Sequence, residues 1–432
     1  MTKPTKNDIA WEKAFDKHDV LNQVSKKGFA DLTAKELILF REPRLMGKID
    51  HKKNLPEIFK INNLSIMTLS RNAYRIGPFK NFEPLPGWET PSKDIEMIGS
   101  SDNLETLNLQ NITSETGVIH TASALGMLNN FCGEKARLTV SGRMSTSKFT
   151  YDIDTIQGNP CSIPVDKAQI EIDAGFEGDE QFYIFEVKTH ISEDFNLRQL
   201  YYPYRTWKSR IEKPVVPIFL TFSNDVFDFY QFDFENPLNC SSIKLSLHRR
   251  FMLSYSNPEE AELVKIAKEN PAKRRYGTTP FPQADDFKRV VDLVVILLRS
   301  PKSVDELATY YGFDPRQSDY YWNAAKFLGL ADSEKYADGI QYRIPTVLAE
   351  SIFAKPYKDK YLSLATLVLS VDAIAKTYLS WVNSGVKPTK AETVTIFKDS
   401  SDSESLSQST VERRASTILS WASWLRSLTE NG

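Results

Sequence analysis

The chain is poor in the residues that soft metal centres and disulfide scaffolds require. It has 432 residues but only 3 cysteines and 5 histidines. The cysteines, Cys132, Cys161 and Cys240, are too far apart for a Cys-x-x-Cys motif, and no histidines are paired at ligand spacing. These absences argue against a zinc fold and a disulfide framework, and they favour a reducing compartment. Any metal ion should therefore be held by oxygen ligands.

Long hydrophobic segments are missing as well. The longest apolar run, residues 290–298, is interrupted by Asp292 and is too short to cross a bilayer. The first residues contain no apolar segment of the secretory type, and no GxxxxGK[ST] phosphate loop is present. With 41% hydrophobic and 25% charged residues, the composition is typical of a soluble globular protein. We therefore expect a cytoplasmic protein without a membrane partner.

The net charge of −2 hides an uneven distribution. Residues 1–80 carry a net charge of +7, residues 81–240 of −12 and residues 241–432 of +3. This pattern fits a protein that concentrates carboxylates in its centre and neutralises a polyanion with its flanks. Ordinary variation between solvated surfaces would produce it too.

The middle of the chain predicts one mixed sheet flanked by helices. A helix is expected over 114–131, because Ser114 can cap it and the pattern is amphipathic. Strands are expected at 136–143, 148–154, 168–176 and 181–189, followed by a helix at 193–211 and a buried strand at 215–223. This order predicts an α/β fold, or more narrowly an α+β mixed-sheet core.

The C-terminal half predicts a winged helix followed by further helices. Helices are expected at 285–300, 303–312 and 314–330, followed by a hairpin over 333–344, and this is the winged-helix order. The predicted divisions are an N-terminal recognition or accessory segment at 1–110, a core at 111–240, a basic linker at 241–285, a winged helix at 286–350 and a C-terminal helical, helix-turn-helix-like module at 351–432.

Three polar side chains stand out at the ends of two predicted strands. Glu186 and Lys188 are two residues apart on one strand and therefore share a face. The residues before them are apolar on both faces, which indicates a covered central strand. Asp173 ends the preceding strand, and the short turn between the strands makes them an antiparallel pair. We expect this geometry to bring Asp173 beside Glu186 and Lys188.

These residues are suited to magnesium chemistry on phosphodiesters. The carboxylates of Asp173 and Glu186, with the backbone carbonyl of Val187, would supply the oxygen ligands that Mg²⁺ prefers. Lys188 would orient or activate a water molecule and stabilise charge on the phosphate. The alternative is that Glu186 and Lys188 form only a structural salt bridge at a strand end, since a Glu-x-Lys tripeptide alone is common.

Residues 114–222 resemble the PD-(D/E)xK nuclease superfamily, whose core is helix, three strands, helix, strand. The acidic residue of that motif matches Asp173 in "IEIDAG", and its (D/E)xK matches Glu186 and Lys188 in "FEVK". Two positions differ: Ile172 stands where the motif has proline, and Pro203 stands where RecB-like members have a tyrosine four residues after the glutamine. The wider context resembles type II restriction endonucleases, which implies a restriction-endonuclease-like core beside sequence-reading domains.

Three further residues are candidates for supporting roles at the site. Glu115 could add a carboxylate, or it could only stabilise the N-terminus of its helix. Glu171 faces the same way as Asp173 and could join the site or remain solvated. Gln199 could contact the site or DNA, or occupy an ordinary exposed helix position.

Basic and polar residues on the flanks are candidates for DNA contacts. A winged helix places its third helix in the major groove, which would present Arg316, Gln317 and Ser318 to base edges. Phosphate contacts are expected from the hairpin, from the helix after the core and from the last helix. Winged helices also bind proteins, and each cation alone could simply be solvated. The phosphate candidates are Arg343, Arg198, Arg205, Arg413 and Arg414.

The resemblance implies a Mg²⁺-dependent, site-specific type II restriction endonuclease that cuts double-stranded DNA and leaves 5′-phosphate ends. One site per chain would require a homodimer on DNA, and a cognate DNA methyltransferase would belong to the same restriction-modification system. The alternatives are a DNA-binding transcriptional regulator built on a non-catalytic nuclease scaffold, and a methylation-dependent or repair nuclease with the same core.

Overall fold

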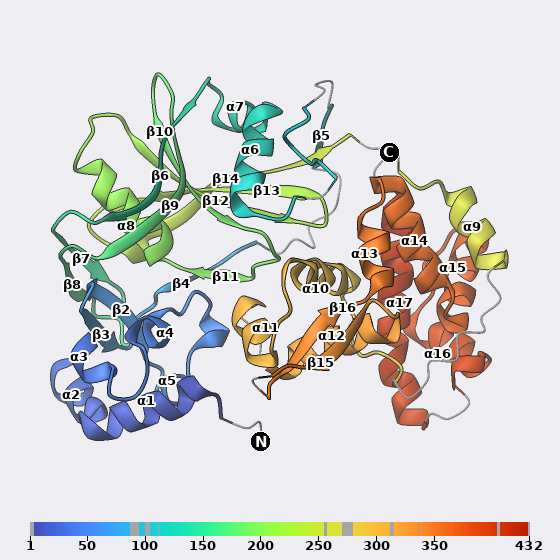
Figure 1. Cartoon of the computed structure of the whole chain (residues 1–432), viewed down its shortest axis with the longest axis horizontal. Coiled ribbons are helices and arrows are strands. Elements are labelled where there is room, and N and C mark those ends of the chain that lie inside the picture. The colour runs from blue at the N-terminus through green and yellow to red at the C-terminus, as the bar shows by residue number, and fades with distance from the viewer. Residues whose placement is uncertain are drawn as a thin grey trace.

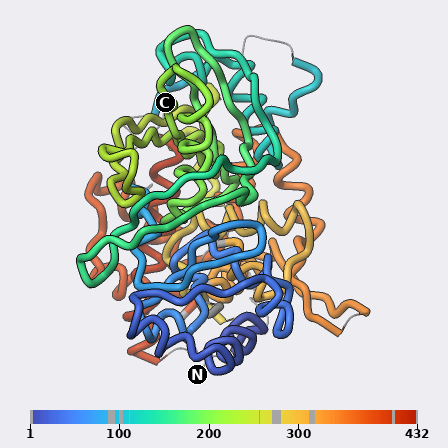
Figure 2. The backbone as a smooth tube through the Cα atoms, turned by 90° about the vertical axis from the view of Figure 1, so that its left-hand side faces the viewer, coloured from blue at the N-terminus to red at the C-terminus, as the bar shows by residue number. Residues whose placement is uncertain are grey.

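The computed structural model describes residues 4–86, 95–99, 104–110, 112–254, 257–269, 280–311, 315–337, 339–403 and 407–430. It is a mixed α/β structure with one large mixed sheet and a C-terminal helical region (Figure 1). The predicted α/β class is confirmed at this level. In both views the N-terminal segment, drawn in blue, lies on one side of the sheet region, drawn in green (Figure 2).

The N-terminal segment has its own core, built on an aromatic cluster. Trp11 packs edge-on against Phe59 at 4.9 Å between ring centroids, and Phe15 packs edge-on against Phe59 at 5.0 Å. Three short strands form its sheet in the order β1-β3-β2. The elements are α1 (Lys6–Lys17), α2 (Val20–Lys27), β1 (Ala30–Thr33), α3 (Ala34–Leu37), α4 (Pro43–Gly47), α5 (Glu57–Ile61), β2 (Ser65–Ser70) and β3 (Ala73–Gly77).

The large sheet has seven strands in the order β5-β14-β13-β12-β10-β9-β6. Its neighbours pair antiparallel except for β10 with β12 and β14 with β5. The parallel pair β10–β12 is joined through α8, since parallel neighbours need a crossover. The strands are β5 (Ile95–Ile98), β6 (Arg137–Ser145), β9 (Gln169–Glu177), β10 (Phe182–Lys188), β12 (Val215–Ser223), β13 (Val226–Phe234) and β14 (Ile243–Leu253).

Helices cover both faces of this sheet around β10. Alternate residues of β10 enter two cores: Tyr183 and Phe185 pack with α6 (Glu115–Ala124) and α7 (Met127–Cys132). Phe182 and Ile184 pack instead with α8 (Arg198–Lys208). The predicted helix over 114–131 is therefore two helices, and α8 continues through Pro203. Burial on both faces explains why β10 is apolar until Glu186.

Three sequence expectations for this region need correction. The strand expected at 148–154 is β7 (Phe149–Ile153), which pairs with β8 (Cys161–Val165) outside the large sheet. The predicted basic linker at 241–285 contains β14 and α9 (Glu260–Glu269). The predicted core of 111–240 omits both β14 and β5, because β5 pairs with β14 across more than a hundred residues of sequence. Two short strands, β4 (Phe82–Pro84) and β11 (Asp194–Asn196), pair beside the large sheet.

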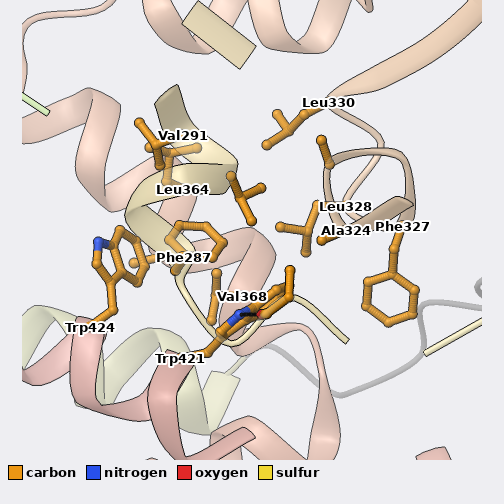
Figure 3. Packing of buried hydrophobic residues seen from close by; sticks show 14 of the residues in the cluster. Phe287, Val291, Ala324, Phe327, Leu328, Leu330, Leu364, Val368, Trp421 and Trp424 are labelled. Carbon is orange, nitrogen blue, oxygen red and sulfur yellow. Dashed lines mark hydrogen bonds between the residues drawn. The ribbon is translucent and has the colours of Figure 1, made fainter. Parts of the chain in front are cut away.

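The C-terminal region is helical around one large apolar core. Phe287 packs against Trp421 and Trp424, and Leu364 and Val368 lie in the same cluster (Figure 3). The predicted hairpin is confirmed as a two-stranded sheet. The elements are α10 (Phe287–Arg299), α11 (Val304–Tyr311), α12 (Pro315–Phe327), β15 (Ala331–Lys335), β16 (Gln341–Pro345), α13 (Val347–Phe353), α14 (Tyr357–Leu369), α15 (Asp372–Ser384), α16 (Lys390–Lys398) and α17 (Gln408–Glu430).

Within the part of the chain that the structure describes, no individual helix has the length and apolar character needed to traverse a bilayer. Helices α14 and α15 are long and apolar enough only when taken together, and the chain bends by 110° between them.

Candidate active site

The candidate site lies where β9 and β10 separate. Their ladder ends at the pair Phe185 and Ala174, whereas β10 continues beside β12 as far as Lys188. Beyond the last pair, the backbone N–H of Val187 donates to Oδ2 of Asp173 at 2.7 Å. Contrary to the sequence prediction, Asp173 therefore does not end its strand: β9 (Gln169–Glu177) remains paired with β6 on the other side, and its separation from β10 leaves a backbone donor that holds the carboxylate.

Glu186 and Lys188 share one face of β10, as the spacing predicts. The ammonium of Lys188 forms an ion pair with Glu186, and each side chain is 13% exposed. Lys188 Nζ also donates to the backbone carbonyl of Val187 at 3.2 Å. The motif residues are therefore in direct contact and almost enclosed by protein.

Two of the three predicted supporting residues reach the same place from different helices. Gln199 in α8 donates from Nε2 to Glu186 Oε1 at 2.7 Å. Glu115, at the start of α6, has its Oε1 at 3.9 Å from Lys188 Nζ and is 44% exposed. Since α6 and α8 cover opposite faces of the sheet, only the fold brings these residues to Lys188.

Glu171 has a different environment. It is exposed on β9, and its Oε1 accepts from Arg143 Nε at 3.2 Å, with both side chains more than half exposed. It faces the same way as Asp173, but it forms a surface ion pair with the neighbouring strand β6. The structure therefore places Glu171 at the rim of the cluster.

The site contains more carboxyl groups than amino groups. Burial raises the pKa of Asp173, and Glu115 raises it further, while Lys188 opposes the shift. Burial also raises the pKa of Glu186, with an added contribution from Asp173. Burial lowers the pKa of Lys188, but Glu186, Glu115, Asp173 and Asp50 outweigh it, so this pKa lies above its usual value. Lys188 is therefore a cation at neutral pH, surrounded by carboxylates whose ionisation is unfavourable.

Asp50 is a site residue that the sequence patterns miss. It lies in the N-terminal segment, yet its charge acts on both Glu186 and Lys188. Its loop is attached to the sheet region through Asn196, which donates from its backbone N to the Asp50 carbonyl at 2.9 Å. Asn196 Nδ2 also donates to the Ile49 carbonyl at 3.0 Å. No local spacing relates position 50 to position 186, so only these tertiary contacts identify it.

The donor chemistry of the cluster fits a hard divalent cation. Asp173 and Glu186 offer carboxylate oxygens, and Val187 offers a carbonyl oxygen; magnesium typically takes one or two protein carboxylates and keeps several waters. Within the described ranges, no group of three or more His, Cys, Asp or Glu side chains is arranged to hold a metal. An ion at this place would have only the two carboxylates and the carbonyl as described protein ligands, with water completing its shell.

The structure describes two of the four DNA-contact residues predicted in the winged-helix region, Ser318 and Arg343, and both side chains are largely buried. Arg316 and Gln317 lie in α12, but their side chains fall outside the described residues. Ser318 is 1% exposed, so its hydroxyl lies inside the helical region and does not face a base edge. Arg343 stacks on Trp322 at 3.7 Å from the ring centroid and pairs with Asp319 at 3.1 Å. These contacts hold the Arg343 guanidinium against α12, where it is only 13% exposed.

The remaining predicted phosphate contacts also differ from one another. Arg205 donates from one nitrogen to the Tyr201 hydroxyl at 2.8 Å and to the Pro237 carbonyl at 2.7 Å, which fixes α8 to a neighbouring loop. Arg414 is 9% exposed. Arg198 is half-buried and Arg413 is exposed, so these two remain available at the surface.

Comparison with known proteins divides the chain into three parts without assigning an activity. Three family models match, each described as a domain of unknown function: DUF6996 over residues 8–76, DUF6997 over residues 77–252 and DUF7226 over residues 289–430. No curated protein and no solved structure matches the chain. The second match contains Glu115, Asp173, Glu186, Lys188 and Gln199, whereas Asp50 lies in the first.

Proposed function

We propose that the protein is a Mg²⁺-dependent endonuclease of the PD-(D/E)xK type that cuts double-stranded DNA. The observation that carries this proposal is the convergence of Asp173, Glu186 and Lys188 at the end of β10, with Glu115 and Gln199 beside them. A purely structural site has little use for two buried carboxylates and a third, partly exposed one near one ammonium, because buried like charges are costly. Such an arrangement is typical of a functional site.

The order of elements supports the finer assignment of the fold. Helix α6, strands β6, β9 and β10, helix α8 and strand β12 occur in the order of the nuclease core that the resemblance implies, with α7, the β7–β8 pair and β11 inserted between them. We propose that α10, α11, α12 and the β15–β16 hairpin form a winged helix that positions the duplex, because three helices and a hairpin are its components. Arg198 and Arg413, which remain at the surface, are the candidate phosphate contacts.

Each residue of the site has a definite task in this proposal. A bound Mg²⁺ would polarise the scissile phosphate and acidify a water molecule. Asp173, held by the Val187 N–H, and Glu186, held by Gln199, would fix the ion's position. Lys188 would orient the attacking water and stabilise the charge that develops on the phosphate. The water oxygen bonds to phosphorus, the bond to O3′ breaks, and O3′ takes up a proton, which leaves a 5′-phosphate.

The biological setting follows from the same proposal. Cutting both strands with one site per chain calls for two copies, so we propose a homodimer on DNA. Site-specific cutting in a cell also requires protection of the host DNA, so a cognate methyltransferase would accompany a type II restriction enzyme of this kind.

The direct test is digestion of methylated and unmethylated plasmid DNA with Mg²⁺ by wild type and by Asp173→Asn. We expect discrete fragments with 5′-phosphate ends from unmethylated DNA, and loss of cutting with retained DNA binding for Asp173→Asn. Glu177→Gln is the matched control. Glu177 lies on the same strand, but it forms an ion pair with Lys213, with 2.9 Å between Nζ and Oε1, and it does not contact the site. It should cut normally.

The alternatives give different results in the same experiment. Fragments from methylated DNA alone would indicate a methylation-dependent nuclease. If wild type retards DNA in a gel but does not cut it, with or without Mg²⁺, the nuclease function is refuted. That result would favour a DNA-binding regulator on the same scaffold. Wild-type cutting by Asp173→Asn would remove this carboxylate from the mechanism.

A further inference from the structure

Three arginine side chains from distant segments converge at one end of the strand pair β6–β9. Arg44 of α4 donates from Nη2 to Gln169 Oε1 at 2.6 Å, and Arg71, between β2 and β3, donates from Nη2 to Ser145 Oγ at 2.9 Å. Ser145 and Gln169 are opposite each other in the register of the two strands. Arg210, just beyond α8, donates from Nη2 to the Ser145 carbonyl at 3.3 Å. We call Arg44, Arg71 and Arg210 the arginine cluster.

The contacts of the arginine cluster leave its charge unbalanced. Its acceptors are an amide oxygen, a hydroxyl, a backbone carbonyl and the sulfur of Met144, all of them neutral. Among the described residues, no carboxylate forms an ion pair with any of the three arginines, and all three are exposed. A guanidinium has five N–H donors, and these contacts use only one or two of them in each arginine. The cluster therefore has both the charge and the donors to bind an anion.

Neighbouring carboxylates do not cancel this charge. The segments that meet at this end of the strand pair carry 8 Lys and Arg against 5 Asp and Glu. Two of those carboxylates already have cations of their own, since Glu171 pairs with Arg143 at 3.2 Å and Asp50 with Lys48 at 3.7 Å. The excess of positive charge occurs in a chain whose net charge is −2, so it is a local feature. The segments are 42–50, 69–73, 143–148, 166–171 and 207–212.

The arginine cluster lies along β9 from the candidate active site. Gln169 precedes Asp173 by four residues on this strand, which corresponds to roughly 13 Å. Glu171 lies between them, and its charge raises the pKa of Asp173, so the surface is continuous from the cluster to the site. Each strand of a DNA duplex has one phosphate about every 3.4 Å along the helix axis. A duplex with its scissile phosphate at Asp173 therefore has other phosphates within reach of the cluster.

We propose that the arginine cluster binds backbone phosphates of the DNA duplex whose scissile phosphate lies at Asp173 and Lys188. Arginine pairs with phosphate through two parallel hydrogen bonds, which suits three exposed guanidinium groups. Arg44 and Arg71 belong to residues 1–80, which carry a net charge of +7, so the N-terminal segment takes part in holding the substrate. The identity of the partner rests on the proposed nuclease function, whereas its binding can be measured without cleavage.

The test is the affinity of the full chain for a fluorescent DNA duplex of about 20 base pairs, measured by anisotropy over a series of salt concentrations. Divalent metal is left out, so that binding is measured without cutting. The logarithm of the affinity falls with the logarithm of the salt concentration, with a slope of about −0.9 for each phosphate contact. This slope counts phosphate contacts, and a purely structural arginine would not change it.

Two substitutions separate the charge of the arginine cluster from its shape. Arg44→Met/Arg71→Met should make the slope shallower by roughly 1.8 and weaken binding at least about tenfold at about 0.1 M salt. Arg44→Lys/Arg71→Lys keeps both charges and should retain the wild-type slope. Thermal unfolding identifies a variant that fails to fold. In that case Arg210→Met decides, with an expected change in slope of about 0.9.

The matched control removes two cations from the opposite end of the same strand pair. Arg137 is exposed and opposite Glu177 in the register of β6 and β9, and Lys213 forms an ion pair with Glu177. Arg137→Met/Lys213→Met changes the net charge as much as Arg44→Met/Arg71→Met does. It should bind with the wild-type slope. An equal loss in this control would show a general effect of charge and would overturn the cluster.

The other outcomes separate this surface from the nuclease function. An unchanged slope in the folded Arg44→Met/Arg71→Met variant, with cutting by wild type in Mg²⁺, would overturn the cluster alone. A slope that depends on the cluster, without cutting by wild type, would refute the nuclease and keep the DNA-binding surface. A slope lost equally in the lysine variant would overturn the phosphate contacts. An RNA duplex bound at least about tenfold more tightly than DNA would overturn DNA as the partner.

Discussion

Carboxylates lie in two places near the ends of β10 and β12, and they differ in how their charge is balanced. At the candidate active site, Glu186 and the partly exposed Glu115 form ion pairs with Lys188, and the charge of Asp173 acts on the same ammonium. Asp292 of α10, which lies far along the chain from Lys188, is 2% exposed, and the charges of Arg289 and Arg299 act on it. It accepts from the Ile191 N–H at 3.0 Å and from Ser223 Oγ at 2.9 Å.

The cluster around Lys188 is the proposed ion-binding site, whereas Asp292 joins elements of the fold. Burial raises the carboxylate pKa in both places. Asp292, however, has both of its oxygens satisfied by neutral donors from the sheet region, so it joins α10 to β12. The cluster around Lys188 has an excess of carboxylates and an open side at Glu115. Such an excess is better explained by a cation and a substrate than by stability.

The largest effect should come from Lys188→Met. Removing the ammonium eliminates both water orientation and charge stabilisation, so we expect cleavage to fall about 10³-fold while DNA binding persists. Plasmid cleavage and gel retardation measure the two effects. Lys213→Met is the control, because its ion pair with Glu177 lies at the other end of β9. Cleavage by a folded Lys188→Met within threefold of wild type would contradict the assignment.

Asp292→Ala should lower the stability of the fold, whereas Lys188→Met should lower cleavage. It leaves the Ile191 N–H and the Ser223 hydroxyl without their acceptor, so we expect the free energy of unfolding to fall by about 3 kcal/mol. Urea denaturation measures it. The exposed Asp305→Ala should change this free energy by less than about 0.5 kcal/mol. If both variants have equal stability, Asp292 does not hold the junction.

Asp292 should also impose a pH dependence on stability. Burial raises its pKa from 3.8 to about 6, although hydrogen bonds from Ile191 and Ser223 oppose the shift. As pH rises, the unfolded chain therefore loses this proton first, and the contribution of Asp292 to stability declines by about 2 kcal/mol between about pH 4 and pH 6. Asp292→Asn removes this titration, so the variant should lose less stability than wild type over that range. Parallel pH profiles for the two proteins would contradict the raised pKa.

The smallest effect is expected from Glu171→Gln. Glu171 and Arg143 are both more than half exposed, and such surface pairs contribute little. Cleavage should stay within about twofold of wild type and the free energy of unfolding within about 0.5 kcal/mol. A tenfold loss of cleavage would instead bring Glu171 into the site, since it lies two residues from Asp173 on the same face.

Local periodicity was sufficient to predict the centre of the candidate site. The alternation of β10 puts Glu186 and Lys188 on one face, and the short turn before it puts Asp173 on the adjoining strand. The sequence failed where contacts cross long distances. Residues predicted as a linker form β14, which also brings β5 into the sheet. Arg343 and Arg414, expected at a DNA surface, are instead packed against the protein.

The amino-acid sequence alone determined the strands and helices that carry the candidate site and which of their side chains share a face, because these depend on periods of two and of about 3.6 residues. Tertiary structure decided the rest: the effect of the Asp50 charge on Glu186, the approach of Glu115 and Gln199 from opposite faces, and the convergence of the arginine cluster. These features arise from contacts between residues far apart in the chain, and no local pattern encodes them.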